Sequence, residues 1–353
     1  MNLQEALAAI RPLDQEAVTR CKAHWDNIGK PLYSLGKLET VTARMAGMFR
    51  TSDVRLNKKA LVIMCADHGV LEEGVSQSPV EVTAVVAENF MTMQASASIM
   101  AKEAGVDVFP VDIAVARDTS IINRKIAYGT ENMAKGPAMT REQAIRGIET
   151  GIKMAEELCQ KGYQIICTGE MGVGNTTASS AMAAVMLHES VEKVTGRGSG
   201  LTDQGLEKKI QVIKRVLDFH RKEMDPEDPI DVLRRVGGYE IAGMAGLYIG
   251  GAACGVPVVI DGMISAVAAL TACRIDSRVR DYMVPSHVSK EPAGAMMLEA
   301  LDMTPFLTCG MHLGEGSGCL MLMPLLDMAL AVYHSMSTFE EINIDAYEPY
   351  EQQ

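Results

Sequence analysis

Aromatic and basic side chains are scarce in this sequence of 353 residues. Only 5% of the residues are aromatic, whereas 25 are methionines, so we expect a core filled mainly by flexible, unbranched side chains. The chain carries 33 basic and 45 acidic residues, which gives a formal net charge of −12. This balance argues against a nucleic-acid partner and against binding to an anionic membrane surface.

The sequence also lacks the cysteine patterns of a disulfide scaffold or a zinc site. Its eight cysteines include no C-x-x-C pair, and most have apolar or glycine-rich neighbours, which is typical of reduced thiols in the cytoplasm. No basic segment followed by an apolar stretch opens the chain, and no segment reaches the ~18 uninterrupted apolar residues of a membrane span. We therefore expect a soluble, cytoplasmic protein without an export signal.

Short apolar runs alternate with longer stretches that have helical character. This alternation predicts an α/β fold, namely a doubly wound, mostly parallel sheet with helices on both faces. The predicted strands are residues 60–65, 106–113, 163–167 and 256–260, with a weaker one at 282–284. The predicted helices are residues 80–103, 141–161 and 202–221, and a further one beginning at Met263.

The two ends of the chain fall outside this alternation. We predict that residues 51–318 form the α/β domain that binds nucleotide and base. Residues 1–50 are expected to be the helical part of a small domain, and residues 319–353, a helix and a tail, are expected to pack with them. The polar end of that tail, residues 340–353, is expected to be peripheral.

The most informative motif is TGEMGVGNTT, residues 168–177, which directly follows a predicted strand. It nearly matches a P-loop, but Asn175 stands where that motif has lysine, with Thr176 after it. Backbone N–H groups at Gly172, Gly174 and the start of the next helix can still hold a phosphate. Without the lysine, a monophosphate ester is favoured over a nucleoside triphosphate, although a degenerate NTP-binding loop is an alternative.

A carboxylate inside an anion-binding loop would repel the phosphate, so Glu170 is a candidate catalytic group. A second candidate is Glu315 in LGEGSG, residues 313–318, where a helix dipole would favour the ionised form that suits a general base. The segment TGRGSGL, residues 195–201, is either a second ligand-binding loop or a surface connection. Lys208 or Lys209 after it could supply the missing cation.

Polar residues follow every predicted strand, and we expect them at one rim of the sheet. Asp67, Asp112 and Asp261 could equally be helix caps or turn formers. His68 and His287 lack the spacing of metal ligands, so structural roles are favoured and no metal site is predicted. The rim residues are Asp67, His68, Asp112, Glu170, Asp261, Ser286 and His287.

Together these motifs resemble the nicotinate-nucleotide:dimethylbenzimidazole phosphoribosyltransferases, which activate the lower ligand of cobamides (vitamin B12). The resemblance covers almost the whole chain, in the order KPLYSLGKLE, ADHGV, TGEMGVGNTT, TGRGSGL, GGYEIAGMAG, VVIDG, SHVS and LGEGSG. It implies a three-layer α/β domain with a small helical domain, and a homodimer. It also implies transfer of phosphoribose from nicotinate mononucleotide to a benzimidazole-type base, with no cofactor.

The resemblance also implies roles for individual residues. Glu315 matches the general base and Glu170 a second carboxylate of the active site. The reaction fits two carboxylates and a phosphate site, because the leaving nicotinate needs no acid, whereas the incoming azole must lose a proton. The matches to phosphate contacts are Gly172, Gly198, Lys209 and Ser289, and the matches to the base pocket are Ser76 and Leu313.

The chain departs from the family pattern at several positions. Val85 replaces a glutamine expected to face the base, which predicts tolerance of simpler benzimidazoles or phenolic acceptors. The alternative is that Val85 only packs in the helix at residues 80–90 and never meets the ligand. An alternative function is an accessory or partner subunit of a phosphoribosyltransferase that acts on another base, such as a phenol. The other departures are Tyr33 for Gly, Ala293 and Gly294 for Gly and His, and His312 for Arg.

Overall fold

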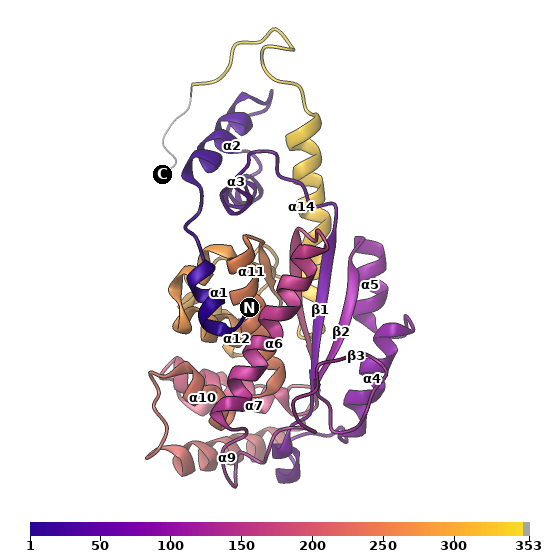
Figure 1. The fold of residues 1–353 in the computed structure, drawn as a ribbon, viewed down its shortest axis with the longest axis vertical. Helices are drawn as coiled ribbons and strands as arrows, with labels where there is room; N and C mark the ends of the chain where they lie inside the picture. Colours follow the sequence, from indigo (N-terminus) through magenta and orange to yellow (C-terminus); the bar gives the residue numbers. More distant parts are fainter. Residues whose placement is uncertain (349–353) are drawn as a thin grey trace.

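The computed structural model describes residues 1–348, so the last five residues of the predicted tail lie outside the described part of the chain. Its centre is a six-stranded sheet in the order β3-β2-β1-β4-β5-β6, in which every pair of neighbours is parallel (Figure 1). The predicted doubly wound α/β fold is confirmed. The strands are β1 (Lys59–Ala66), β2 (Asp107–Ala114), β3 (Ile122–Asn123), β4 (Ile165–Met171), β5 (Val258–Ile260) and β6 (Met283–Pro285).

The central strand β1 is buried over its whole length. It pairs with β2 on one side and β4 on the other, and helices cover both of its faces. A strand in this position needs no polar face, which explains why its sequence is a continuous apolar run rather than an alternating one. The sequence missed only β3, a two-residue strand at the edge that is too short to produce a pattern.

One face of the sheet is covered by α11 (Tyr239–Cys254) and α12 (Met263–Ile275), with α6 (Arg141–Gln160) packed on α11. The helices α6 and α11 approach unusually closely, since a Cβ on Gly246 would lie 1.9 Å from the carbonyl oxygen of Ile148. Helix α11 is not predicted from the sequence. The helix is buried almost all round and rich in glycine, so it shows no amphipathic pattern.

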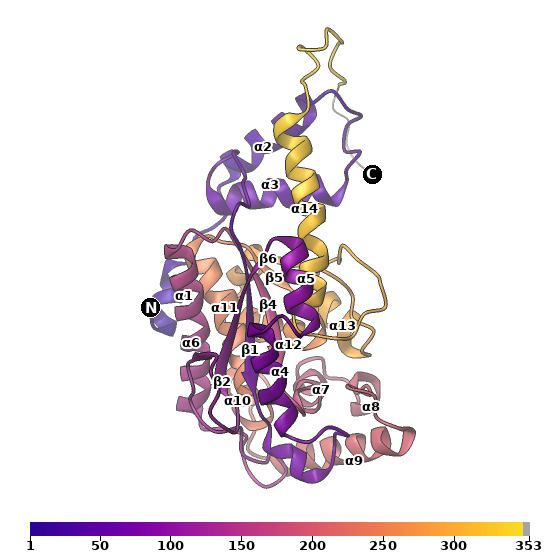
Figure 2. The same cartoon turned by 90° about the vertical axis from the view of Figure 1, so that its right-hand side faces the viewer.

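The other face carries α4 (Glu81–Met91), α5 (Ser96–Ala104) and the first turns of α14 (Ser317–Ser335) (Figure 2). The prediction of one helix over residues 80–103 was wrong. The chain breaks between α4 and α5, where Met93 has a left-handed backbone with φ of 59°. Both segments turn apolar residues toward the sheet, so a pattern of apolar spacing alone could not reveal the break.

The C-terminal half of α14 leaves the sheet and packs with α2 (Gln15–Asn27) and α3 (Lys37–Phe49). The ring of Tyr333 lies 5.0 Å from that of Trp25, and its hydroxyl donates a hydrogen bond of 2.8 Å to the Ser52 carbonyl. In contrast, α1 (Leu3–Ala9) packs on α6 and α11. By length and composition α14 could span a bilayer, but 56% of its apolar window is buried in the protein. The domain boundaries stay a prediction.

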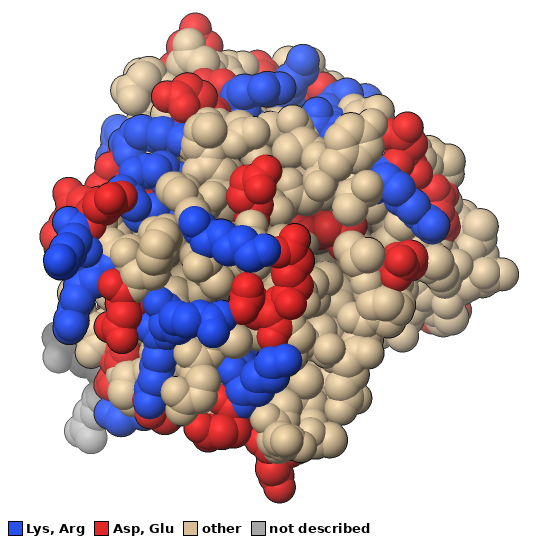
Figure 3. Space-filling view, turned by 90° about the horizontal axis from the view of Figure 1, so that it is seen from below, with Lys and Arg blue, Asp and Glu red and all other residues tan. Residues whose placement is uncertain are grey.

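Most of the remaining helices lie at the carboxyl end of the sheet, toward the lower end of the molecule in Figure 2, whereas the short helix that directly precedes β6 lies at the amino end. They are η1 (Gly69–Glu73), α7 (Asn175–Met186), α8 (Val191–Val194), α9 (Asp203–His220), α10 (Pro229–Val236), η2 (Ser277–Tyr282) and α13 (Ala293–Ala300). Seen from below, basic and acidic side chains are interspersed over much of this surface (Figure 3). The side on which α4 and α5 lie is largely uncharged.

Candidate functional site

A cavity of about 1120 Å³ opens at the carboxyl ends of β4, β5 and β6. Its walls include the segments that directly follow these strands, and two glycine-rich loops close it from further along the chain. The strand order reverses between β1 and β4. Ligands of doubly wound sheets bind beside such a reversal, so the cavity is the candidate site.

The loop after β4 places the start of a helix at this cavity. Gly172 lies so close to β1 that a Cβ would be 2.3 Å from the carbonyl oxygen of Ala66. Gly174 has a left-handed backbone with φ of 98°, and α7 begins at the next residue, Asn175. The predicted strand, glycine loop and helix are therefore present in that order, and the helix start can bind an anion through backbone N–H groups.

Lys209 supplies a cation beside the same loop. Its side chain extends from α9 and is 1% exposed, and its Nζ donates hydrogen bonds to Thr176 Oγ1 at 2.9 Å and to the Gly196 carbonyl at 3.1 Å. Removal from water lowers the pKa of Lys209 to about 8, although Glu291 opposes the shift. Lys208, in contrast, is exposed. Of the two predicted lysines, Lys209 is the one that reaches the loop.

Two further segments close over the start of α7. Gly198 fits against Thr176, since a Cβ on Gly198 would lie 2.7 Å from Thr176 Oγ1. Ser289 is buried and lines the cavity. Glu291 also lines it, and its Oε2 is buried without a hydrogen-bond partner among the described residues. Glu291 is not predicted from the sequence, although it follows closely on the SHVS motif at residues 286–289.

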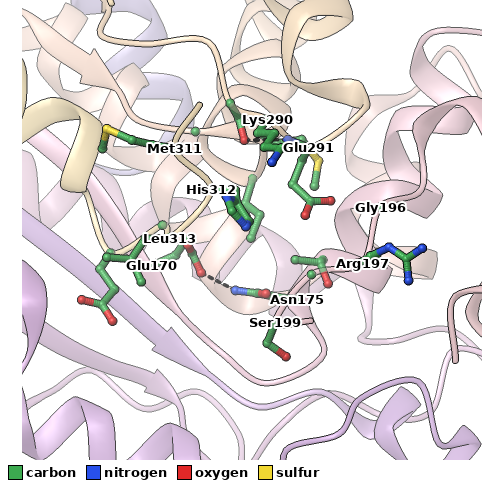
Figure 4. Close-up of a pocket in the computed structure, with 18 of the residues that line it drawn as sticks. Glu170, Asn175, Gly196, Arg197, Ser199, Lys290, Glu291, Met311, His312 and Leu313 are labelled. Atoms are coloured by element: carbon green, nitrogen blue, oxygen red, sulfur yellow. Dashed lines mark hydrogen bonds between the residues drawn. The ribbon is translucent and has the colours of Figure 1, made fainter. Parts of the chain in front are cut away.

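Glu170 is near the end of β4, directly before the glycine loop, and lines the cavity. The side-chain amide of Asn175 donates a hydrogen bond to it (Figure 4). Gly314 leaves room for this carboxylate, because a Cβ there would lie 2.2 Å from Glu170 Oε1. Burial, followed by repulsion from Asp261 and other carboxylates, raises the pKa of Glu170 to about 8. Asn175 therefore holds Glu170 in place where a P-loop lysine would bind phosphate.

Glu315 has a left-handed backbone with φ of 61°, between Gly314 and Gly316, which are left-handed too. Such conformations are costly for residues other than glycine and often occur at functional sites. Glu315 Oε2 accepts a hydrogen bond of 3.1 Å from the backbone N–H of Ala97, at the start of α5. The prediction that a helix dipole keeps Glu315 readily ionised was wrong in sign, because burial outweighs this hydrogen bond and raises its pKa.

A third carboxylate, that of Asp261, also lines the cavity. It follows β5 and accepts hydrogen bonds from the N–H groups of Gly318 at 2.7 Å and Gly316 at 3.2 Å, so it fixes the start of α14. Burial raises the pKa of Asp261 to about 7, despite these hydrogen bonds. His287 Nε2 is 3.8 Å from the same carboxylate, and burial lowers the pKa of this histidine.

Four of the predicted rim residues do not line the cavity. One is Ser286, whose hydroxyl donates a hydrogen bond of 2.6 Å to the Ile260 carbonyl. Asp67 accepts a hydrogen bond from the N–H of Ala116, and Asp112 forms an ion pair of 3.0 Å with Lys125. His68 is paired with Glu240 at 3.0 Å beneath the glycine loop. The two aspartates stabilise the turns that follow β1 and β2, so their interpretation as turn formers is the better one.

The predicted base-pocket residues divide into two groups. Ser76 and Leu313 line the cavity, whereas Val85 does not and is 49% exposed on α4. Val82, one turn earlier on the same helix, does line it. The expectation that Val85 faces the base is therefore not supported. Apolar side chains from several segments complete this part of the lining, namely Met100, Met263, Ile264 and Met311.

The other departures from the family pattern also have structural counterparts. Tyr33 is left-handed, with φ of 58°, which explains why glycine is favoured at this position. Gly294 lies in α13, where a Cβ would be 2.7 Å from the carbonyl oxygen of Ser289. His312 is exposed and lines the cavity beside Leu313 (Figure 4). Only the last of these three positions lies in the cavity wall.

Within residues 1–348, no group of three or more His, Cys, Asp or Glu side chains is arranged to hold a metal ion. The carboxylates of the cavity are instead engaged by backbone N–H groups and by Asn175. The absence of a metal requirement stays a prediction.

Comparisons with known proteins agree on one family. The family model described as "Phosphoribosyltransferase" matches residues 10–344. The nicotinate-nucleotide–dimethylbenzimidazole phosphoribosyltransferase of Ruminiclostridium cellulolyticum is 44% identical over 99% of this chain and 100% of its own. The one from Acetivibrio thermocellus is 44% identical over 98% and 99%. The crystal structure of CobT from Thermus thermophilus superposes with a TM-score of 0.87 at 36% identity, over 94% of this chain and 99% of that chain.

Proposed function

This chain belongs to the nicotinate-nucleotide:dimethylbenzimidazole phosphoribosyltransferase family, and we propose that it transfers phosphoribose from nicotinate mononucleotide to a benzimidazole-type base with Glu315 as general base. The products are an α-ribazole 5′-phosphate and nicotinate, for assembly of the cobamide nucleotide loop. The family membership confirms the resemblance noted from the motifs.

The observation that carries the assignment of roles is the separation of charge within one cavity. Lys209 and the start of α7 form a site for an anion. Glu170, Asp261 and Glu315 form a cluster of carboxylates beside it. Nicotinate mononucleotide carries a negative phosphate and a positive pyridinium, so both parts of the cavity complement it. This supports Gly172, Gly174, Thr176, Gly198, Lys209 and Ser289 as the phosphate site.

Glu315 is the residue best placed to accept a proton. Its pKa is raised by burial, and a carboxylate that binds its proton more tightly is a stronger base, provided that it is ionised when the azole arrives. The hydrogen bond from the backbone N–H of Ala97 engages its Oε2. We assign the other oxygen, Oε1, to accept the azole proton while the ring nitrogen attacks the ribosyl carbon.

Glu170 has a different role. Burial raises its pKa to about 8, whereas a bound pyridinium or the developing ribosyl cation favours its ionised form. We assign it to electrostatic stabilisation of that cation, opposite the incoming base. Asn175 keeps its carboxylate oriented in either state, because the amide N–H can donate to a neutral or to an ionised acid.

The acceptor ring is expected against the apolar lining formed by Val82, Met100, Met311 and Leu313. Methionine side chains adapt to rings of different shape. This lining supports an aromatic base of benzimidazole size, and it supports some tolerance in the choice of base. Ser76 and His312 are the polar groups of the lining that could distinguish ring substituents.

The test is a reaction of the purified chain alone with nicotinate mononucleotide and a panel of benzimidazoles and phenols, with products identified by mass spectrometry. A phosphoribosylated base and free nicotinate are expected, with the same rate in EDTA. No product from the chain alone, but product after addition of a homologous subunit, would instead support the accessory role. Loss of activity in EDTA that magnesium restores would contradict the metal-free site.

We also propose that the chain is a cytoplasmic homodimer. The outer surfaces of α4, α5 and α14 expose a group of large apolar side chains. Contact with a partner would remove these side chains from water. A second copy of the chain is the expected partner, and replacing Ile99 or Met328 with Glu should give a monomer in light-scattering measurements. The group consists of Val85, Met91, Met93, Ile99, Met321 and Met328.

A further inference from the structure

A second cavity, of about 710 Å³, lies at the opposite end of the strands from the candidate active site. Its lining includes Gln164 and Val256, which precede β4 and β5, so it opens at the amino ends of the strands. Cys159 and Cys254 both line it, together with Arg11 and other residues. Both thiols are partly exposed and are not in a disulfide.

The packing of α6 on α11 brings these two cysteines face to face. A Cβ on Gly147 would lie 2.7 Å from the Cβ of Ala242, and a Cβ on Gly250 would lie 2.8 Å from that of Ala155. The two helices therefore run parallel and in register, with their backbones in close approach. Cys159 and Cys254 come four residues after Ala155 and Gly250, one helical turn further along each helix.

The two thiols influence each other's ionisation: Cys159 lowers the pKa of the Cys254 thiol, whereas Cys254 and then burial raise the pKa of Cys159. A reactive dithiol usually combines one thiol that ionises readily with a neighbouring thiol that stays protonated. Cys254 is therefore the nucleophile, and Cys159 is the thiol that follows it.

A structural metal is the less suitable occupant. Zinc in such sites takes four ligands, and the described residues offer no group of three His, Cys, Asp or Glu at this place. We propose that Cys159 and Cys254 form a reversible disulfide that joins the ends of α6 and α11. The oxidant is a low-molecular-weight disulfide such as oxidised glutathione, whose carboxylates suit a cavity that contains Arg11 and Arg50.

The exchange takes place in two steps. The Cys254 thiolate attacks one sulfur of the oxidant, which forms a mixed disulfide and releases one thiolate. Cys159 then gives its proton to the released thiolate and attacks Cys254 Sγ, which forms the Cys159–Cys254 bond and releases the second thiolate. The protein loses two electrons and two protons, and the oxidant is reduced to two thiols.

The disulfide is expected to change stability more than activity. It would close a loop of 95 residues between positions 159 and 254, and long loops gain most from cross-linking. We expect the Tm to rise by roughly 5 °C on oxidation. No described residue of α6 or α11 lines the active-site cavity, so the rate of phosphoribosyl transfer should stay within about twofold, by the rule that distant sites act independently.

The experiment treats the full chain with oxidised glutathione, alkylates the remaining thiols and maps the peptides by mass spectrometry. A peptide pair linked through Cys159 and Cys254, released by dithiothreitol, is expected. In Cys159→Ser the linked pair should be absent, and Cys254 should carry a glutathionyl group. Cys273→Ser is the matched control, because Cys273 is also partly buried but faces Met283 rather than a thiol, and the linked pair should still form.

The proposal would be overturned if Cys159 and Cys254 were both recovered as alkylated thiols after the exposed Cys309 had been fully converted. A disulfide that links either residue to another cysteine would overturn it equally. If a serine variant folds poorly, the alkylation rates of the two thiols in the unmodified chain give an independent measurement, and Cys254 should react faster than Cys159.

Discussion

The active-site cavity has two parts, which complement ligand groups of opposite charge but resemble each other in being buried. The glycine loops and Lys209 form a cationic part, and Glu170, Asp261 and Glu315 form an anionic part. Both are buried, and burial disfavours charge in both. The pKa of Lys209 is lowered to about 8, and that of Glu170 is raised to about 8.

Burial therefore shifts both Lys209 and Glu170 toward their uncharged forms. A ligand with a phosphate and a pyridinium returns a countercharge to each part, so binding and ionisation support one another. The two parts differ in how they are built. The cationic part relies on backbone groups and one lysine, whereas the anionic part relies on three side chains from separate strands and loops.

The largest expected effect lies in the anionic part. Glu315→Gln should lower turnover with a benzimidazole by at least ~100-fold, because it removes the general base. Binding of nicotinate mononucleotide, measured by calorimetry, should change little, since the phosphate site is untouched. Turnover within a few-fold of the parent protein would exclude Glu315 as the base and leave Glu170 or Asp261 as the candidate.

The next effect tests the cationic part. Lys209→Met should raise the KM for nicotinate mononucleotide by roughly 10- to 100-fold, because it removes a charged hydrogen bond to phosphate. The KM for the base should stay nearly the same. Lys208→Met is the matched control on the same helix, where the side chain is exposed and lies outside the cavity lining. Equal effects of the two variants would show that Lys209 acts only through general charge.

The two parts were also unequally predictable from the sequence. The glycine loop was found because closely spaced glycines after an apolar run have few structural explanations, and Gly172 and Gly174 indeed allow the close approach and left-handed turn that α7 requires. Five of the six strands were found for a similar reason. Buried parallel strands are continuous apolar runs, and such runs are visible in any sequence.

Side-chain environments were much less predictable. The sequence indicated that Asp67, Asp112 and Asp261 follow strands, but only the structure separates Asp261, which lines the cavity, from the other two, which stabilise turns. The raised pKa of Glu315 was likewise hidden, because it depends on burial by segments distant in sequence. Helix α11 was missed because glycines replaced the polar face that marks most helices.

A smaller effect concerns stability and pH. Glu170 has a pKa of about 8 in the folded protein and about 4.5 as a free side chain. Between these values the folded state keeps a proton that the unfolded state has lost, so its contribution to stability falls as pH rises through this window. Glu170→Gln should therefore stabilise the empty protein at pH 8.5, on the order of 1–2 kcal/mol relative to pH 5, after allowance for relaxation.

Urea unfolding of both proteins at the two pH values gives this difference directly. Saturating nicotinate mononucleotide is expected to remove the stability advantage of Glu170→Gln at pH 8.5, because the bound pyridinium favours the ionised acid. A stability difference that does not change between pH 5 and pH 8.5 would show that Glu170 titrates normally and that burial does not govern the anionic part.

The smallest expected effect concerns Val85, and it tests whether the choice of base depends on the cavity lining alone. Val85 is 49% exposed and outside the lining, whereas Val82 on the same helix lies in it. Val85→Gln should leave the ratio of rates for two competing bases within about twofold, since a change outside the pocket alters no contact with the ring. Val82→Gln should shift that ratio by roughly fivefold or more, because an amide then faces an aromatic acceptor.

The two variants carry the same substitution on one helix, so their helix propensities cancel. Paired bases competing in one tube give both ratios, and a shift in Val85→Gln as large as that in Val82→Gln would return Val85 to the base pocket and show that α4 moves when the base binds.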